Sequence, residues 1–372
     1  MKYMDFLKQN VGLIYFILPY VQVVENKFGL ISSIFFGRKN YHVKLKDNIS
    51  ITFPSSKFSR MMDLLGILTF SSYFSKKDDK IEFSFDTKNK FSVPIKNMSY
   101  EDENLLELFF GSIKYGANFI TDDNVDMNNY RDKTFKILKH EEKKIIETPN
   151  GIKFYIDSIH PGNSIIETFV RKIHLMNPNL DFKDKVVVDV GAECGDTPLY
   201  FAGLGAKVFA FEPVKQHFDD MIRNISLNPK LSKNIIPVNA GIGKDGYLTF
   251  YQDGSGIVGS TSFVENVHGE DAKELKVKGL SLETALKEYN ISHIDLLKMD
   301  CKGCEFFLTE NSLKNVDRIK IEFSKFSNFE LADILNLLEK VGFEYMTFIT
   351  EPSHHVSPMI ETNIYATKKE IS

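Results

Sequence analysis

The sequence predicts an α/β protein whose C-terminal part is a doubly wound sheet of seven mostly parallel strands. Two observations predict this fold. From about Asp184 on, short apolar runs without alternation are each followed by a turn and a helical pattern, as buried parallel strands require. A turn containing glycines follows the first of these runs, at the edge where open α/β sheets bind ligands.

Length and composition are typical of a folded protein with two domains. At 372 residues, with 43% hydrophobic and 26% charged residues, the chain is neither disordered nor fibrous. We expect an N-terminal α+β region of hairpins and helices at 1–143 and a second domain at 144–372. The net charge of −4 provides no basic field, so nucleic acid is not an expected partner.

The N-terminal region is predicted to contain three units, each a strand pair followed by a helix. The pairs are expected at 41–53, at 81–85 with 91–93, and at 144–147 with 152–156, and the helices at 58–70, 101–113 and 164–176. Asp47-Asn48 supplies the first turn. No motif here carries chemistry, so we expect the region to select substrate, to form a homo-oligomer or to cover the active site.

One apolar run, at 11–21, resembles a membrane segment but is shorter than the ~20 residues that a spanning helix needs. It also contains Pro19, and Asp5 precedes it. A buried helix or a docking face is therefore the favoured interpretation. A peripheral membrane contact through residues 11–35 stays open as the alternative.

The seven strands of the C-terminal domain follow from its apolar runs. They are expected at 186–190, 207–211, 235–239, 294–299, 318–323, 345–349 and 363–366. The last two are close in the sequence, which predicts an antiparallel hairpin at one edge of the sheet.

The strongest functional motif follows the first of these strands. It is Asp189-Val-Gly191-Ala192-Glu193-Cys-Gly195-Asp-Thr197, and the next helix is expected to begin near Asp196. Glycines allow a ligand to approach the backbone, and the helix start adds free N–H groups. A dinucleotide fingerprint would need glycine at Glu193, so a nicotinamide-dependent oxidoreductase is only a third alternative.

Polar residues also end the next strands. Glu212-Pro213 closes the second, where an acid about 20 residues beyond the loop can accept both hydroxyls of a ribose. Asn239-Ala240 closes the third and would flank the adenine, although a turn-entry asparagine is nearly as common. Asp300 follows the fourth strand, at the edge where reaction chemistry is expected.

The number and spacing of the cysteines indicate a reducing compartment. The chain has 3 of them, an odd number without a disulfide framework, which favours a cytoplasmic location. Cys301 and Cys304 form a C-x-x-C without a second ligand pair at zinc-finger spacing, so we expect packing cysteines and no metal.

These motifs together resemble the FkbM family of S-adenosylmethionine (SAM)-dependent methyltransferases, over about residues 145–370. The resemblance implies a class I, Rossmann-like domain with SAM as cofactor, which methylates hydroxyl groups of glycans, sugars or other small metabolites. It implies that Gly191, Ala192 and Gly195 line the methionine part of SAM. Asp300 would face the sulfonium and the incoming hydroxyl. The cofactor site would draw on Asp189, Gly191, Ala192, Glu193, Gly195, Thr197, Glu212, Pro213, Asn239, Ala240 and Asp300.

Catalysis and acceptor binding are assigned to the same edge. Asp300 is the first candidate for the base that accepts the hydroxyl proton, and Glu322 is the second. Lys302 stands where the family has Glu, and Ser324 where it often has His. These two, with Ser260 in the Gly- and Ser-rich loop 253–262, are expected on the acceptor side. The alternative function is a SAM- or carbohydrate-binding protein that has lost catalysis.

Overall fold

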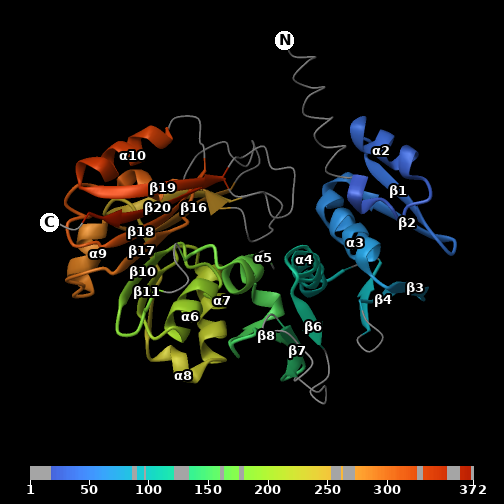
Figure 1. Cartoon of the computed structure of the whole chain (residues 1–372), viewed down its shortest axis with the longest axis horizontal. Coiled ribbons are helices and arrows are strands. Elements are labelled where there is room, and N and C mark those ends of the chain that lie inside the picture. The colour runs from blue at the N-terminus through green and yellow to red at the C-terminus, as the bar shows by residue number, and fades with distance from the viewer. Residues whose placement is uncertain are drawn as a thin grey trace, which may run out of the picture. The chain divides into compact units, whose positions relative to one another are not determined.

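The computed structural model describes two compact units, which divide the chain after Pro149. The described residues are 18–85, 90–95, 98–120, 134–159, 163–175, 180–252, 261–262, 273–324, 330–349 and 361–369. Each unit is described by itself below (Figure 1). Among these residues no helix is both long enough and apolar enough to cross a membrane.

The N-terminal unit begins with η1 (Leu18–Tyr20), α2 (Lys27–Phe35) and a hairpin of β1 (Asn40–Leu45) and β2 (Ile49–Pro54). The expected turn is confirmed: Asp47 and Asn48 have φ of 60° and 57°, the left-handed region that Asp and Asn tolerate. Both strands alternate buried and exposed residues, so one face packs inward. η2 (Ser55–Lys57) leads into α3 (Phe58–Phe70), whose bounds agree with the predicted helix.

The second hairpin belongs to a three-stranded sheet of β3 (Tyr73–Lys77), β4 (Lys80–Ser84) and β5 (Phe91–Pro94). It is followed by α4 (Tyr100–Tyr115), whose first turn is closed by a capping box between Ser99 and Asp102. Aromatic rings of Phe83, Phe91 and Phe109 form the centre of this layer, with centroids 4.6–5.8 Å apart. Helices α3 and α4 pack so closely that a Cβ on Gly66 would overlap the ring of Phe110.

Further strands precede the C-terminal unit. They are β6 (Asn118–Ile120), β7 (Thr134–His140) and β8 (Lys143–Glu147), with β6 and β7 parallel and β7 and β8 antiparallel. Of these only β8 was expected. After β9 (Lys153–Tyr155) and η4 (Ile156–Ser158), the predicted helix 164–176 is wrong in extent: α5 (Asn163–Ile166) passes into a π-helix (Glu167–Arg171) that ends at Lys172, where φ is 54°.

The C-terminal unit is built on one mixed sheet of seven strands. They are β10 (Val186–Val190), β11 (Lys207–Phe211), β12 (Ile235–Val238), β17 (Leu296–Met299), β18 (Arg318–Ser324), β19 (Phe343–Ile349) and β20 (Glu361–Lys368). Across the sheet the order is β12-β11-β10-β17-β18-β20-β19. The first five are parallel, and β20 pairs antiparallel with both β18 and β19, which confirms the expected closing hairpin.

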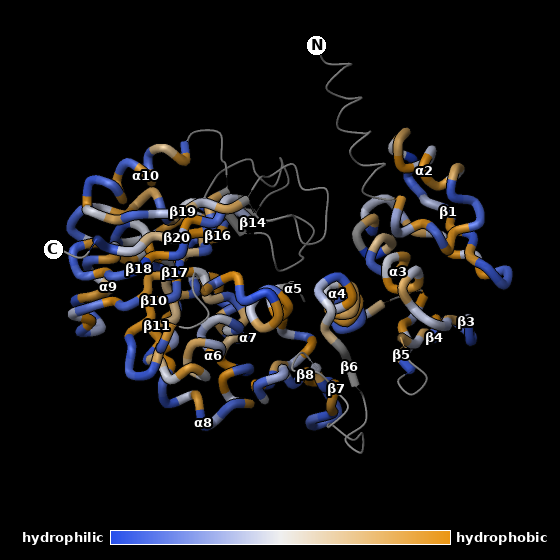
Figure 2. Tube along the Cα trace, viewed as in Figure 1, coloured by the Kyte–Doolittle hydropathy of each residue, from blue (hydrophilic) through white to orange (hydrophobic). Residues whose placement is uncertain are grey.

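The order of the strands predicts where a ligand would bind. β10 has β11 on one side and β17 on the other, so the chain reverses direction along the sheet at this strand. In open α/β sheets the crevice lies beyond the carboxyl ends of the strands at such a reversal. Figure 2 shows that β10, β11 and β17 are strongly hydrophobic, as expected of strands covered on both faces.

Helices and a smaller sheet complete this unit. The helices are α6 (Asp196–Gly203), α7 (Lys215–Ser226), α8 (Pro229–Ser232), α9 (Leu282–Glu288), η6 (Cys304–Phe307) and α10 (Leu331–Lys340). In Figure 1, α6 lies beside β11 and α10 beside β19. The smaller sheet, which the sequence did not predict, contains β13 (Gly241–Ile242), β14 (Gly246–Gln252), β15 (Thr261–Ser262) and β16 (Lys273–Leu280).

Candidate active site

The turn after β10 is shaped by two glycines. Gly191 has φ of 79°, and a Cβ on it would lie 2.0 Å from the carbonyl oxygen of Asp300. Gly195, with φ of 86°, forms the N-cap of α6, and a Cβ there would lie 2.9 Å from a side-chain carbon of Met221. Both positions therefore require glycine for its conformation and for its small size. Helix α6 begins at Asp196, as predicted.

A buried ion pair stabilises this turn. The Lys298 Nζ lies 3.0 Å from Asp189 Oδ1 and donates a hydrogen bond to the Gly191 carbonyl at 3.1 Å. Thr197 donates its hydroxyl hydrogen to the other Asp189 oxygen. Burial disfavours the Lys298 ammonium, but the Asp189 carboxylate outweighs this and raises the pKa of Lys298. Asp189 is fully buried, so it acts on a ligand only through the turn that it holds.

Glu212 lies directly after β11 and faces the same turn. Its Oε2 accepts from the Glu193 N–H at 2.9 Å, and its Oε1 accepts from the Val214 N–H at 2.9 Å. His217 Nδ1 lies 3.6 Å from Oε1. A carboxylate has about four acceptor positions, so these three contacts orient Glu212 and leave about one position for a ligand hydroxyl.

Asn239 supports Glu212 from the next strand. Its Nδ2 donates to the carbonyls of Glu212 at 2.8 Å and of Pro213 at 3.2 Å. The amide group therefore fixes the turn after β11, and the side chain stays partly exposed. Ala240, which follows it, is fully buried.

Glu193 lies at the rim of the site in a strained backbone conformation, with φ of 43°. Its side chain is partly exposed, yet burial raises the pKa of its carboxyl to about 8. Carboxylates of Asp196, Glu212 and Asp300 raise the pKa further, and His217 opposes them. A carboxyl in this position changes its charge near neutral pH.

A second group of charges lies at the ends of β17 and β18. The Asp300 side chain is 27% exposed, and its Oδ1 lies 4.0 Å from Lys302 Nζ. Burial raises the pKa of Asp300, but nearby lysines, Lys302 foremost, outweigh burial and hold it below its usual value. Glu322, which is 9% exposed, also lowers the pKa of Asp300.

Lys320 completes this group from within β18. It is fully buried, and its Nζ lies 3.5 Å from Glu322 Oε2. Sequence reasoning missed both Lys320 and Lys298. The signal that could have found them is a single lysine inside an apolar strand, in Leu-Leu-Lys298-Met and Ile-Lys320-Ile. A lysine buried in a sheet must have an acidic partner.

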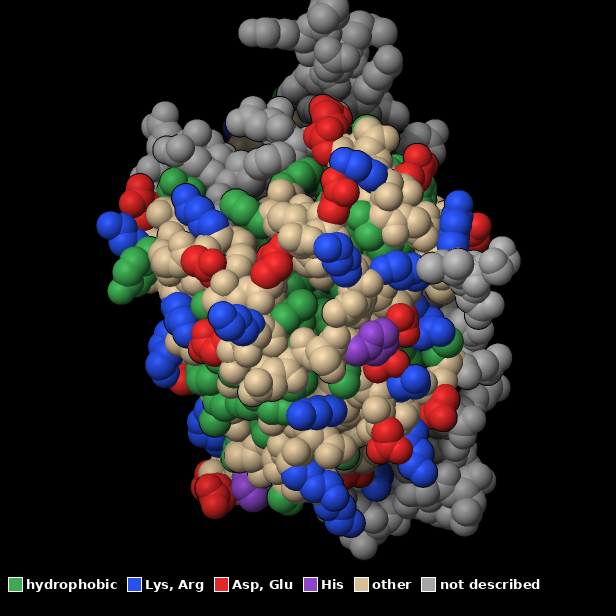
Figure 3. All heavy atoms as spheres, turned by 90° about the vertical axis from the view of Figure 1, so that its left-hand side faces the viewer, with side chains coloured by type: hydrophobic (Ala, Val, Ile, Leu, Met, Phe, Trp, Pro, Cys, Tyr) green, Lys and Arg blue, Asp and Glu red, His purple; other side chains and the backbone are tan. Residues whose placement is uncertain are grey.

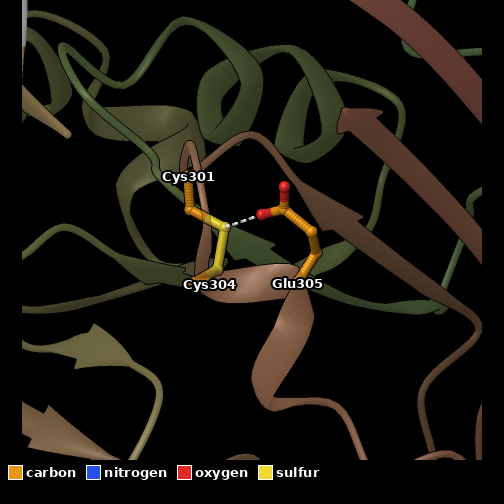
Figure 4. A group of neighbouring side chains, drawn as sticks. All are labelled: Cys301, Cys304 and Glu305. Atoms are coloured by element: carbon orange, nitrogen blue, oxygen red, sulfur yellow. Dashed lines mark hydrogen bonds between the residues drawn. A yellow bond between two sulfur atoms is a disulfide. The ribbon is translucent and has the colours of Figure 1, made fainter. Parts of the chain in front are cut away.

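The expectation for the C-x-x-C cysteines is wrong, because Cys301 and Cys304 form a disulfide. Between them Lys302 and Gly303 have φ of 49° and 124°, and this tight turn brings the two sulfurs together. Figure 4 shows the Glu305 carboxylate turned toward Cys301, 3.5 Å from its sulfur. Burial raises the pKa of Glu305 to about 7.

The remaining candidates are placed only in part. Ser324 ends β18, where its backbone pairs with Glu361, and its side chain is not described. Ser260 lies outside the described residues, as do residues 253–259 of the predicted substrate loop and residues 11–17 of the predicted docking segment.

The seven-stranded sheet and the turn after β10 are those of a Rossmann-like domain, and the family comparison indicates its chemistry. Residues 189–345, less than half of the chain, match the model described as "Methyltransferase FkbM domain". This part of the chain is a methyltransferase domain of the FkbM family, and its cofactor is SAM. A comparison with curated proteins finds no match.

The solved structures that this chain matches include methyltransferases and a pre-rRNA processing protein. Magnesium protoporphyrin IX methyltransferase from Synechocystis PCC 6803, with bound SAM, is 11% identical, with 51% of this chain and 72% of that chain covered and a TM-score of 0.30. An rRNA methylase from Streptococcus thermophilus is 14% identical, with coverages of 50% and 89% and a TM-score of 0.32. The fibrillarin pre-rRNA processing protein of Methanococcus jannaschii is 13% identical, with coverages of 80% and 98% and a TM-score of 0.35. At these low scores the likenesses say nothing about activity.

The residues at this edge of the sheet fit SAM. Gly191 lets the turn pack directly against the Asp300 backbone, and the oriented Glu212 carboxylate retains an acceptor position for a ribose hydroxyl. Acidic side chains around the turn suit a cofactor that carries a positive sulfonium.

Proposed function

We propose that the C-terminal unit transfers the SAM methyl group to a hydroxyl of a glycan, a sugar or another small hydroxylated metabolite. The observation that carries this proposal is the Asp300–Glu322 pair. An alcohol must lose its proton as the new bond to oxygen forms, and a carboxylate held in its ionised form can accept that proton. Asp300 is held so by its lysine neighbours and is partly exposed at the edge of the Gly191 turn.

The chain's own residues would divide the work as follows. Gly191, Ala192 and Gly195 shape the turn that receives the cofactor, and Glu212 accepts hydrogen bonds from the ribose. Asn239 positions Glu212 and borders the adenine. Bound SAM supplies the electrophilic methyl group. Asp300 takes the hydroxyl proton, and Glu322, the second candidate for the base, lies close to it.

Lys302 adds a charge on the acceptor side. Its Nζ is close enough to Asp300 to keep the carboxylate ionised, and the side chain is 31% exposed. An acceptor with an acidic group would find a cation there. We propose Lys302 and Ser324, with Ser260, as acceptor contacts.

Methyl transfer from isotope-labelled SAM to a panel of sugars, glycans, amines and phenols tests the reaction. We expect label in alcohol products, and Asp300→Asn to lower the rate by about 10²–10⁴-fold while SAM binding persists. The matched control is Asp219→Asn, on the exposed side of α7, which should transfer at the wild-type rate. SAM binding without transfer to any acceptor would favour the non-catalytic alternative.

We also propose partners and a location for the whole chain. Positive and negative side chains are interspersed on the face seen in Figure 3, which supports a small-molecule or glycan acceptor rather than nucleic acid.

Phe28, near the start of α2, is 82% exposed, and this supports a peripheral membrane contact through residues 11–35 of a cytoplasmic protein. Phe36, directly after α2, is 69% exposed. Flotation with liposomes tests the contact, and protein that stays at the bottom of the gradient would refute it. The homo-oligomer stays a prediction, to be tested by sedimentation.

A further inference from the structure

The disulfide between Cys301 and Cys304 lies where the proposed reaction would take place. Cys301 directly follows Asp300, and its Cα lies 3.5 Å from the position of a Cβ on Gly191. The disulfide therefore closes a loop that contains Lys302 and begins directly after Asp300, and the backbone of Asp300 and Cys301 packs against the turn that receives SAM. Breaking this bond would therefore affect both the segment with Asp300 and Lys302 and the turn that receives SAM.

The two sulfurs differ in access. Cys301 is partly exposed, whereas Cys304 is 1% exposed within the core of the domain. An external thiol can therefore attack Cys301, while Cys304 is sheltered as the leaving group. In thiol–disulfide exchange the attack occurs at one sulfur and releases the other, so this difference in access favours attack at Cys301.

Glu305 is a hydrogen-bond acceptor to which Cys301 can donate only in the reduced state, when its sulfur carries a hydrogen. Its Oε2 lies 3.5 Å from the Cys301 sulfur and accepts a hydrogen bond from the Gly303 N–H at 2.9 Å (Figure 4). A disulfide sulfur has no hydrogen to donate, whereas a Cys301 thiol would have one. The other oxygen, Oε1, is buried and has no hydrogen-bond partner among the residues that the structure describes. The same carboxyl can thus accommodate both states of the pair.

We propose that Cys301–Cys304 is a redox-active site that exchanges with a dithiol reductant. The reductant's thiolate attacks the Cys301 sulfur, the S–S bond breaks, and Cys304 leaves as a thiolate. The reductant's second thiolate then attacks the mixed disulfide and releases Cys301. Two electrons pass to the cysteines, the reductant becomes a disulfide, and its two protons end on Cys301 and Cys304.

Reduction should weaken SAM binding, because it frees the loop on which the Gly191 turn rests. The redox pair itself is independent of the proposed reaction, whereas an effect on methyl transfer rests on the proposed function. Disulfides of proteins in a reducing compartment are mostly transient and catalytic or redox-sensing.

Thiol counting tests the pair on the full chain. Air-oxidised and dithiothreitol-treated protein are each unfolded in N-ethylmaleimide, and labelled peptides are identified by mass spectrometry. We expect one label in the oxidised protein, at Cys194, and three after reduction. Three labels in protein exposed to an oxidant would overturn the proposal. So would one zinc ion per chain that protects both cysteines in the native protein, since Cys301, Cys304 and Glu305 have ligand atoms within 4.8 Å of one another.

Calorimetric titration with SAM tests the consequence. We expect at least a threefold weaker affinity in the reduced wild type, and no redox response in Cys301→Ser, which should resemble the reduced form. Equal affinity in both states, with the labels changing as expected, would refute coupling to the site. If neither state binds SAM, the cofactor assignment fails, while the thiol count still decides the redox proposal.

Discussion

Replacing Gly191 by alanine should damage both stability and cofactor binding. The added Cβ would lie 2.0 Å from the carbonyl oxygen of Asp300 and 2.8 Å from its carbonyl carbon. Backbone atoms cannot rotate away, so either the turn or the end of β17 must move. A left-handed conformation costs an alanine about 1–2 kcal/mol, and overpacking adds about 1–3 kcal/mol. We expect the free energy of unfolding to fall by about 2–5 kcal/mol.

Gly342→Ala is the matched control for this substitution. Gly342 has φ of 88°, close to that of Gly191, but a Cβ there would have no atom within 4 Å. In the control the free energy of unfolding should therefore fall only by the cost of the left-handed conformation, about 1–2 kcal/mol. Urea denaturation followed by circular dichroism measures the loss, and calorimetric titration measures SAM affinity, which we expect to fall at least tenfold in Gly191→Ala alone. If the two variants lose equal stability and bind SAM equally, the close contact with Asp300 is refuted.

Three other substitutions probe the charges of the site. Glu212→Gln should weaken SAM binding by about 10–100-fold, because hydrogen bonds to a charged group contribute about 1.5–3 kcal/mol, and an unchanged titration curve would remove Glu212 from the cofactor site. SAM affinity should rise between pH 7 and pH 9, as Glu193 loses its proton near pH 8 and attracts the sulfonium, and Glu193→Gln should flatten this profile. Lys298→Met should cost about 3–5 kcal/mol in denaturant unfolding, because it leaves Asp189 buried without its cation, and adding Asp189→Asn should recover part of the loss. A double variant less stable than Lys298→Met would contradict that ion pair.

Local patterns were enough to predict many elements. The helix at Phe58–Phe70 follows from its apolar periodicity, and the first hairpin from Asp47-Asn48, residues that accept a left-handed backbone. The strands of the large sheet were visible because burial on both faces demands continuous apolar residues. β16 was missed because its sequence, Lys-Glu-Leu-Lys-Val-Lys-Gly-Leu, has more charged residues than apolar ones. Its strand structure depends on pairing with β14.

The candidate site was predictable in position but only partly in its contacts. Strand ends indicated Glu212 and Asp300, because parallel strands share one edge. The partners of these residues are separated in sequence, so no local pattern links Lys298 to Asp189 or Asn239 to the Glu212 backbone. The disulfide was missed because it depends on the left-handed backbone of Lys302, a residue type that rarely adopts it.

The position of β20 between β18 and β19 has a consequence for synthesis on the ribosome. The five parallel strands up to β18 can assemble as soon as residue 324 has left the exit tunnel, yet β18 then has an unpaired edge. That edge stays open until residues 361–368 emerge and insert between β18 and β19. A nascent chain stalled before this point exposes a hydrogen-bonding edge that other chains can join, so slow synthesis between β18 and β20 should lower the yield of native protein.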